Sequence, residues 1–488
     1  MQYCSGPRSH ITDSHYYSHG YTTPEARAVF CDQRRLQRWL DVEVALALSQ
    51  AVVGMVPTEV ANRLQETARL DLLDCETIKN DITKTGHSLI PLLDQWQQAA
   101  GPEAAHFIHY GATTQDIQDT AQSLEISDII TIVERDLTLI ITELAKLTSK
   151  HHQQIIIGRT HGQHALPTTL GLKMAIWLDE MLRHGQRLQE CRQRVLVSQL
   201  FGGVGTMAAL GDRPQDLLEE FSKRLGLSAP NTAWHTSRDR IAEFISCLAL
   251  ITGTMAKIAN EISQLAKNET GELEEPFHMG KIGSSTMPHK RNPELCEQVV
   301  VLSRLVKSAA GLGLDGLINE HERDYRATRL EWAGLVDASL YSCGALDLMK
   351  KIMAGLIVHP DRISHNLETS ACLISTEALM FLIGNKIGKQ AAHQLLYEIS
   401  MEAHNSGDLL GKLLSRHPLI KNSFTEKEIK EAINPATHIG SAVEQADRVV
   451  VMAKRWLSAN KAMNKQPSPC PLADSTHGCK VNQQRENP

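Results

Sequence analysis

The stretch ISDIITIVERDLTLIITELAKL, residues 126–147, determines the fold that we expect of this chain. Its apolar residues recur at alternating steps of four and three, which places them on one face of a helix of about 30 residues. This stripe consists of Ile126, Ile130, Val133, Leu137, Ile140, Leu144 and Leu147. Residues 172–200 and 241–265 repeat the pattern, so the sequence predicts three long helices.

Helices of this length pack as a bundle or extend as a coiled-coil rod. The connections at 164–167, 202–212 and 283–293 are richer in glycine and proline than a rod requires, so we favour the bundle. Apolar residues also lie off the main stripe, which indicates that further subunits cover the outer faces. Strand signals are weak, although 154–157 could extend. We therefore predict an all-α protein that forms an oligomer.

The overall composition is that of an ordinary soluble protein. Of the 488 residues, 42% are hydrophobic and 22% are charged, which is typical of globular domains. The formal charge of −6 gives no general attraction to nucleic acid or to an anionic membrane. The ten cysteines form no CxxC pair, so we expect reduced thiols.

Neither a membrane span nor a signal peptide is expected. No apolar run reaches the roughly 18–20 residues of a span, and the polar first twenty residues lack the apolar stretch of a signal peptide. A cytoplasmic protein is therefore expected.

Composition also suggests how the chain is divided. Residues 1–19 and 463–488 are polar and without helical period, so we expect both to be flexible tails. Between them we expect an N-terminal helical domain at 20–111, a central bundle at 112–360 and a C-terminal helical domain at 361–462.

The segment GSSTMPHKRNP, residues 283–293, concentrates groups able to bind an anion. Its glycine, serines and prolines end the preceding pattern, so it forms a loop, and Pro293 suits the start of a helix at Glu294. Lys290, Asn292 and backbone N–H groups would bind an anionic substrate beside a serine. Composition alone also fits a solvated basic turn.

Three segments of the chain resemble signature regions of the fumarase/aspartase superfamily. They are YGATTQDIQDT at 110–120, GRTHGQHALPTT at 158–169 and the loop at 283–293, which fits the pattern GSSxMPxKxNP. The resemblance covers about residues 20–460. It implies a three-domain, mostly helical subunit and a homotetramer whose 20-helix core brings the three segments together from three subunits. It also implies anti elimination from a succinyl compound through an aci-carboxylate, releasing fumarate without a metal or cofactor.

The resemblance assigns roles to individual residues. Ser284 matches the general base, His161 the general acid, and Glu297 a carboxylate that pairs with that histidine across the subunit boundary and raises its pKa. Taken singly, each such residue has an ordinary alternative, such as a surface histidine or a helix-start aspartate. The implied substrate-binding set, within which Asp116 holds its loop in place, is His87, His109, Thr113, Thr114, Asp116, Thr160, Gln163, Lys290, Asn292, Arg323 and Arg329.

Two branches of the superfamily are similar to this chain. His87 and His109 match substrate-binding histidines of adenylosuccinate lyases, and residues 20–25 resemble their RYxxPE start. The pair Glu331-Trp332 is more similar to the corresponding residues of 3-carboxy-cis,cis-muconate cycloisomerase. We therefore expect an adenylosuccinate lyase of purine nucleotide biosynthesis, with a cycloisomerase-like enzyme of aromatic catabolism as the alternative.

The chain also departs from the adenylosuccinate lyase pattern. Gly20 replaces an arginine, and Ser237 replaces a glutamine that is usual in both branches. Residues 325–332, YRATRLEW, replace the serines and arginine of the nucleotide-phosphate site. The identity of the substrate therefore stays open at this stage.

Three other classes of protein fit the sequence less well. The pattern GVGTMA at 203–208 resembles a dinucleotide fingerprint, but a long helix precedes it where a strand is needed. The histidines between 151 and 164 lack a carboxylate or cysteine at metal-site spacing. A non-catalytic helical scaffold has no physical need for Ser284, His161 or Lys290.

Overall fold

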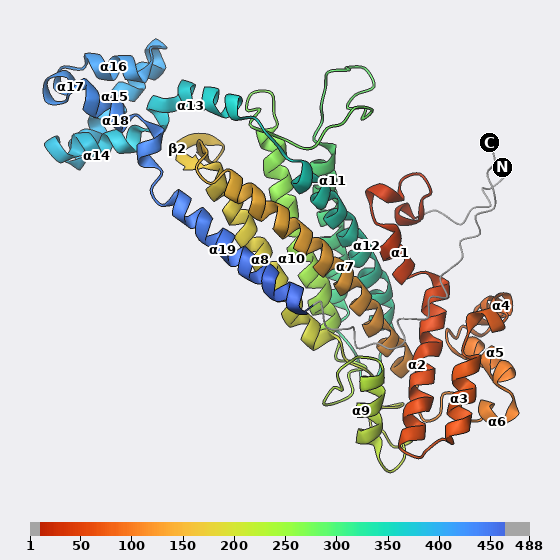
Figure 1. The fold of residues 1–488 in the computed structure, drawn as a ribbon. Helices are drawn as coiled ribbons and strands as arrows, with labels where there is room; N and C mark the ends of the chain where they lie inside the picture. The colour runs from red at the N-terminus through yellow and green to blue at the C-terminus, as the bar shows by residue number, and fades with distance from the viewer. Residues whose placement is uncertain (1–9, 464–488) are drawn as a thin grey trace.

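Five long helices run side by side through the centre of the molecule (Figure 1). The computed structural model describes residues 10–463, so the predicted C-terminal tail lies almost wholly outside the described residues. Helices α10, α11 and α12 pack on one another, and α7 packs on α8 and α12. The arrangement confirms the all-α class. These helices are α7 (Thr114–Lys150), α8 (Leu170–Val195), α10 (Asp239–Leu265), α11 (Glu294–Asp315) and α12 (Tyr325–Gly355).

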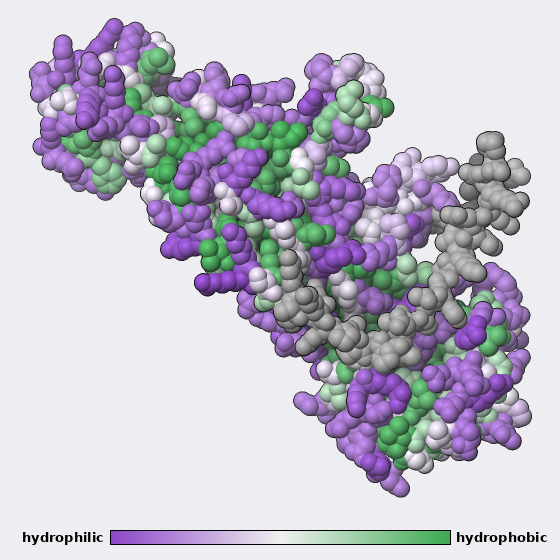
Figure 2. All heavy atoms as spheres, viewed as in Figure 1, coloured by the Kyte–Doolittle hydropathy of each residue, from purple (hydrophilic) through white to green (hydrophobic). Residues whose placement is uncertain are grey.

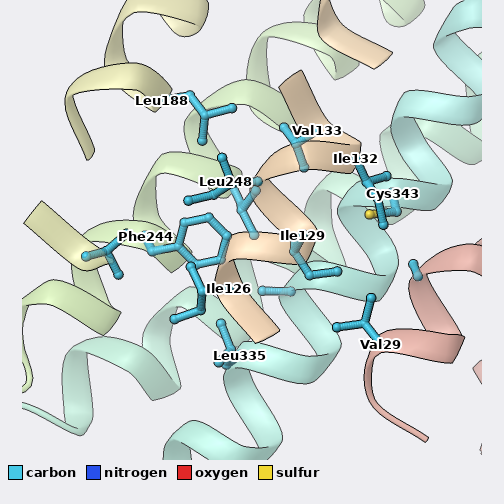
Figure 3. Packing of buried hydrophobic residues seen from close by; sticks show 14 of the residues in the cluster. Val29, Ile126, Ile129, Ile132, Val133, Leu188, Phe244, Leu248, Leu335 and Cys343 are labelled. Carbon is cyan, nitrogen blue, oxygen red and sulfur yellow. The ribbon is translucent and has the colours of Figure 1, made fainter. Parts of the chain in front are cut away.

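The apolar stripe of α7 lies in the core of this bundle. Ile126 and Val133 are fully buried, and Figure 3 shows them beside Phe244 and Leu248 of α10. Ile129, which is off the stripe, is fully buried as well. A helix with apolar residues on more than one face packs between several neighbours, and α7 indeed contacts α1, α2, α8, α12 and α19.

The N-terminal helices cluster around the start of α7 (Figure 1). The sequence predicts a flexible start up to about residue 19, but residues 10–19 contain two short 3-10 turns, η1 (Ile11–Asp13) and η2 (Ser18–Gly20). Thr12 and Ser18 are buried, so the prediction is wrong for this part. The helices are α1 (Pro24–Val29), α2 (Asp32–Val52), α3 (Thr58–Thr67), α4 (Cys75–Thr85), α5 (Ile90–Ala100) and α6 (Pro102–Ala105), with η3 (Leu70–Leu72) between α3 and α4 and α9 (Pro214–Arg224) packed on α2.

A second, smaller core lies beyond the bundle, at the other end of α7 (Figure 1). Buried Leu379, Ile383 and Leu396 belong to it. The chain then returns to the bundle through α19 (Ala442–Met463), which packs on α7 and α8. The division into three domains stays a prediction. The helices before α19 are α13 (Pro360–Ile374), α14 (Thr376–Ile387), α15 (Lys389–Ser406), α16 (Leu410–Arg416), α17 (Pro418–Ser423) and α18 (Glu426–Ala432), followed by η4 (Pro435–His438).

Two short antiparallel sheets complete the described fold. Strands β1 (Ile155–Thr160) and β2 (Gln163–Thr169) form a hairpin, and β3 (Leu273–Glu274) pairs with β4 (Ile357–Val358). Strand β1 begins within residues 154–157, which the sequence analysis names as a possible extended segment.

Two described segments have the length and hydropathy of a membrane span, although the sequence analysis expects no span. One is α10, which packs between α8, α11 and α12 and is therefore a core helix. The other, 360–387, is interrupted at Ser375, where α13 ends and α14 begins. Both hydropathy signals thus arise in helices of the folded body.

A fully buried arginine joins three parts of the bundle. The Arg238 guanidinium donates to Asp119 of α7 at 2.8 and 3.0 Å and to Glu331 of α12. All three side chains are at most 4% exposed. Because a buried charge is tolerated only when it is paired, this cluster fixes the starts of α7 and α12 relative to each other.

We expect Arg238→Met to destabilise the protein strongly. The change leaves two carboxylates buried without their cation, which costs roughly 3–5 kcal/mol. Arg194→Met is the control, because the Arg194–Glu243 pair is exposed and such pairs contribute about 1 kcal/mol or less. Thermal melts at one protein concentration compare the variants, and equal melting temperatures would contradict the assigned role of the cluster.

Candidate active site

The residues that the sequence predicts to act together lie at two opposite ends of the bundle (Figure 1). Thr113 and Thr114 stand at the start of α7, whereas His161 follows its end. Because α7 has 37 residues, these ends are about 55 Å apart at 1.5 Å per residue. We call them the threonine end and the loop end.

At the threonine end, Asp116 holds two loops together. Its carboxylate accepts the N–H groups of Thr113 at 3.0 Å, Phe201 at 3.0 Å and Gly202 at 2.9 Å. The His235 ring lies 3.1 Å from the same carboxylate, and Asp116 is fully buried. Thr113 thereby caps α7 in a capping box.

Arg323 connects the Thr113 loop to the turn that contains Gly203. Its guanidinium donates to the Thr113 hydroxyl at 2.9 Å and to the Gly203 carbonyl at 2.7 Å. Thr114 is the first residue of α7. Hydroxyls, a guanidinium and a helix N-terminus therefore face one region, which is the donor set that a carboxylate needs.

His109 is held by a buried glutamate that the sequence analysis missed. Its Nδ1 lies 2.6 Å from Glu43 of α2, which is 1% exposed. His109 also has a positive φ of 60°. Burial lowers the pKa of His109, but the hydrogen bond and charge of Glu43, with the charge of Asp116, outweigh it and raise the pKa above 6.5. His109, beside the threonine end, therefore holds its proton more readily than a free imidazole does.

His87 precedes the neighbouring helix α5, which begins at Ile90. Its Nδ1 accepts the N–H groups of Leu89 at 3.3 Å and Ile90 at 3.1 Å, so the ring proton resides on Nε2. The adjacent Ser88 accepts from Gln118 of α7 at 2.7 Å. The Nε2 side of His87 is therefore the donor edge of this ring near the start of α7. Arg329, the last predicted residue at this end, lies in the second turn of α12.

At the loop end, His161 occupies the tip of the β1–β2 hairpin. Thr160 pairs with Gln163, and His161 and Gly162 have φ values of 52° and 78°. Positive φ at both central residues matches a two-residue type I′ turn, and it explains the glycine. The His161 ring is exposed and is presented outward by the hairpin.

The hairpin is tied to the rest of the loop end. Arg159 donates two hydrogen bonds, at 2.9 and 2.7 Å, to Glu272, which is fully buried. His164 lies 3.0 Å from Ser370 of α13, and burial lowers its pKa. His164 and Gln163 are exposed at this hairpin together with His161, and the contact with Ser370 joins the hairpin to α13.

The 283–293 loop closes on itself and ends where predicted, since α11 begins at Glu294. The Asn292 amide donates to the Gly283 carbonyl at 2.7 Å. A Cβ at Gly283 would lie 2.1 Å from the Lys290 carbonyl oxygen, so only glycine fits there. The Ser284 oxygen accepts the N–H groups of Met287 at 3.0 Å and Thr286 at 3.3 Å.

Two donors aimed at one hydroxyl oxygen favour its deprotonated form. The base of the loop is fixed by Glu275, which is 2% exposed and binds Lys281 at 2.8 Å as well as the first N–H groups of α11. A cavity of about 990 Å³ opens beside the loop, and its lining includes Lys290, Asn292 and Glu297. Within residues 10–463 no hydrogen bond or ion pair joins Glu297 to His161, so their pairing stays a prediction.

Comparisons with known proteins identify the family of this chain. The family model described as "Lyase" matches residues 19–307. The chain belongs to the fumarase/aspartase superfamily of lyases. A second model, "Adenylosuccinate lyase C-terminus", matches residues 372–449.

Individual members of the superfamily match along nearly their whole length. N-acetyl-S-(2-succino)cysteine lyase of Dickeya dadantii is 41% identical, over 91% of this chain and 97% of that protein. Adenylosuccinate lyase of Methanothermobacter thermautotrophicus is 35% identical, over 90% and 98%. The crystal structure of 3-carboxy-cis,cis-muconate lactonizing enzyme from Pseudomonas putida superimposes with a TM-score of 0.84 at 33% identity, over 91% and 100%.

The buried glutamates that the sequence analysis did not predict share one sequence signal. Glu43 lies within the apolar run WLDVEVALAL of α2. Glu272 and Glu275 directly flank the strand residue Leu273 and its neighbour. An acidic residue at a position that a helix or strand buries must have a partner, so an unexplained glutamate in such a run would have been the signal.

We expect Glu43→Gln to lower the pKa of His109. A protonated His109 attracts an anionic substrate below its pKa and loses this attraction as pH rises through it, so the variant should lose kcat/KM at a lower pH than the wild type. NMR titration of His109 measures the pKa directly. The control is Glu59→Gln, an exposed glutamate on the adjacent α3; a His109 pKa that is the same in both variants would refute the role of Glu43.

Proposed function

We propose that this lyase eliminates fumarate from a succinyl thioether of an N-acylated cysteine. The observation that carries the elimination chemistry is the pair of N–H groups, from Thr286 and Met287, that converge on the Ser284 oxygen. A serine is a poor base in water, and such donors together with the charge of Lys290 make its alkoxide accessible.

The proposed reaction divides the chemistry among the predicted residues. Ser284 removes the proton beside one succinyl carboxylate, and the C–H electron pair moves into that carboxylate to form the aci-carboxylate. Lys290 and the remaining N–H of Asn292 stabilise the added charge. The C–S bond then breaks as the C=C bond of fumarate forms, and His161, supported by Glu297, protonates the leaving sulfur.

A complete site requires more than one subunit. Asn292 precedes α11 and Arg323 follows it, and the 22 residues of α11 separate them by about 33 Å. We therefore propose a homotetramer in which the loop end of one subunit meets the threonine end of another. Figure 2 shows hydrophobic residues at the surface along the bundle. Large apolar side chains between 41% and 54% exposed lie on these helices and would be covered in the assembly: Leu139, Ile176, Leu250, Val301 and Leu314.

The leaving half of the substrate is inferred from two observations. The N-acetyl-S-(2-succino)cysteine lyase of Dickeya dadantii shares 41% of its aligned residues with this chain, against 35% for the archaeal adenylosuccinate lyase. Residues 325–332 also lack the serines and arginine of the nucleotide-phosphate site. The expected products are fumarate and N-acetylcysteine, and a cytoplasmic location suits such metabolites.

Adenylosuccinate is the second candidate substrate. The match of residues 372–449 to the C-terminal model of that lyase favours it, as do His87 and His109 near the threonine end. Both candidates share the succinyl group and the release of fumarate, and they differ in the leaving half, an N-acylated cysteine that leaves through sulfur in one and a nucleotide that leaves through nitrogen in the other.

A substrate panel separates the candidates. Purified protein should release fumarate, followed by its ultraviolet absorbance, from N-acetyl-S-(2-succino)cysteine with a kcat/KM well above that for adenylosuccinate. The reverse order would establish the second candidate. Loss of 3-carboxy-cis,cis-muconate without fumarate release from either compound would contradict both.

Ser284→Ala should lower kcat by at least roughly 10²-fold, which is the usual effect of removing a positioned base. Ser285→Ala is the matched control, because Ser285 is the exposed neighbouring hydroxyl. Thermal stability should change little in either variant, since both residues lie in a surface loop. Near-normal turnover of Ser284→Ala would exclude this serine as the base.

A further inference from the structure

Arg329 is a candidate cation at the threonine end without a carboxylate partner among the described residues; Arg323 also makes no ion pair there, but its guanidinium is occupied by Thr113 and the Gly203 carbonyl. Its guanidinium lies 4.3 Å from the Trp332 ring centroid and 4.4 Å from that of Tyr325. Within the described residues 10–463 it makes no hydrogen bond or ion pair. Arg326, on the same helix, is instead paired with Asp324 at 2.6 Å and Glu320 at 2.8 Å.

The aromatic surface under Arg329 continues toward His109. Trp332 meets Trp39 of α2, with ring centroids 6.3 Å apart. Trp39 and Glu43 are four residues apart and so lie on one face of α2, and Glu43 binds His109. The same part of α12 is joined to α7 through Glu331 and Arg238. The packing of Trp332 on Trp39 thus places Arg329 beside the part of α2 that holds His109 through Glu43.

A guanidinium stacked on aromatic rings keeps its charge and has its hydrogen-bonding edge available. The two carboxylates of a succinyl group are already matched by the Thr113 region and by Lys290 with Asn292. An additional unpaired cation therefore points to an anionic group elsewhere in the substrate. We propose that Arg329 binds an anionic group of the leaving half and so selects the substrate; for a thioether this group is the cysteine carboxylate.

This inference rests on the proposed function, and one pair of substrates tests it. The first is N-acetyl-S-(2-succino)cysteine, and the second is the same compound with its cysteine carboxylate converted to a neutral carboxamide. Arg329→Gln should raise KM for the acid about tenfold or more, the effect expected for one charge-assisted contact. It should leave KM for the amide unchanged, and Arg329→Lys should recover part of the affinity for the acid.

Arg326→Gln is the matched control, because this arginine is neutralised by its own carboxylate partners. Arg326→Gln should change KM for the acid and KM for the amide to the same extent. Equal KM increases for both substrates in Arg329→Gln would overturn the inference, since they would reveal a merely structural role.

Failure of the proposed function has a different signature, because the wild type would then cleave neither thioether. In that case adenylosuccinate and its dephosphorylated nucleoside provide the same comparison, with the phosphate in place of the carboxylate. A KM increase confined to the phosphorylated compound supports the role of Arg329. Equal effects on both compounds, or cleavage of neither by the wild type, overturn it.

Discussion

The length of the central helices is the constraint on which the rest of this lyase depends. A four-carbon succinyl group can contact only residues within a few ångströms of it, whereas the 22-residue α11 and 37-residue α7 separate the two groups of candidate residues by about 33 and 55 Å. Rigid, well-packed helices cannot bend to close such gaps. The proposed homotetramer would therefore explain both the exposed apolar side chains of these helices and the separation of the two groups of candidate residues within one chain.

Buried carboxylates hold the candidate residues at each end of the bundle in position. Asp116 fixes the Thr113 loop, Glu43 the His109 ring, Glu272 the hairpin behind His161, and Glu275 the base of the serine loop. Each is at most 2% exposed and would be costly to bury without its partners. The candidate residues that face the substrate are consequently supported by groups that have no direct role in chemistry.

Much of this could be predicted from the sequence, for identifiable reasons. The stripe from Ile126 to Leu147 specified a buried long helix, because helical periodicity is a local signal. The glycine and prolines of 283–293 specified the loop and the start of α11. Contacts between distant segments carry no such signal, and the Glu43–His109 pair spans 66 positions. The order of residues 10–19 also depends on tertiary packing, since Thr12 is buried there.

The sharing of one site between the two ends is tested most directly by mixing two variants that have each first been shown to be inactive alone, Ser284→Ala at the loop end and His109→Ala at the threonine end. If each site combines the loop end of one subunit with the threonine end of another, subunit exchange creates sites without either lesion. Random mixing at equal amounts should then restore roughly one quarter of wild-type turnover. No recovery after mass spectrometry has verified mixed assemblies would contradict the account.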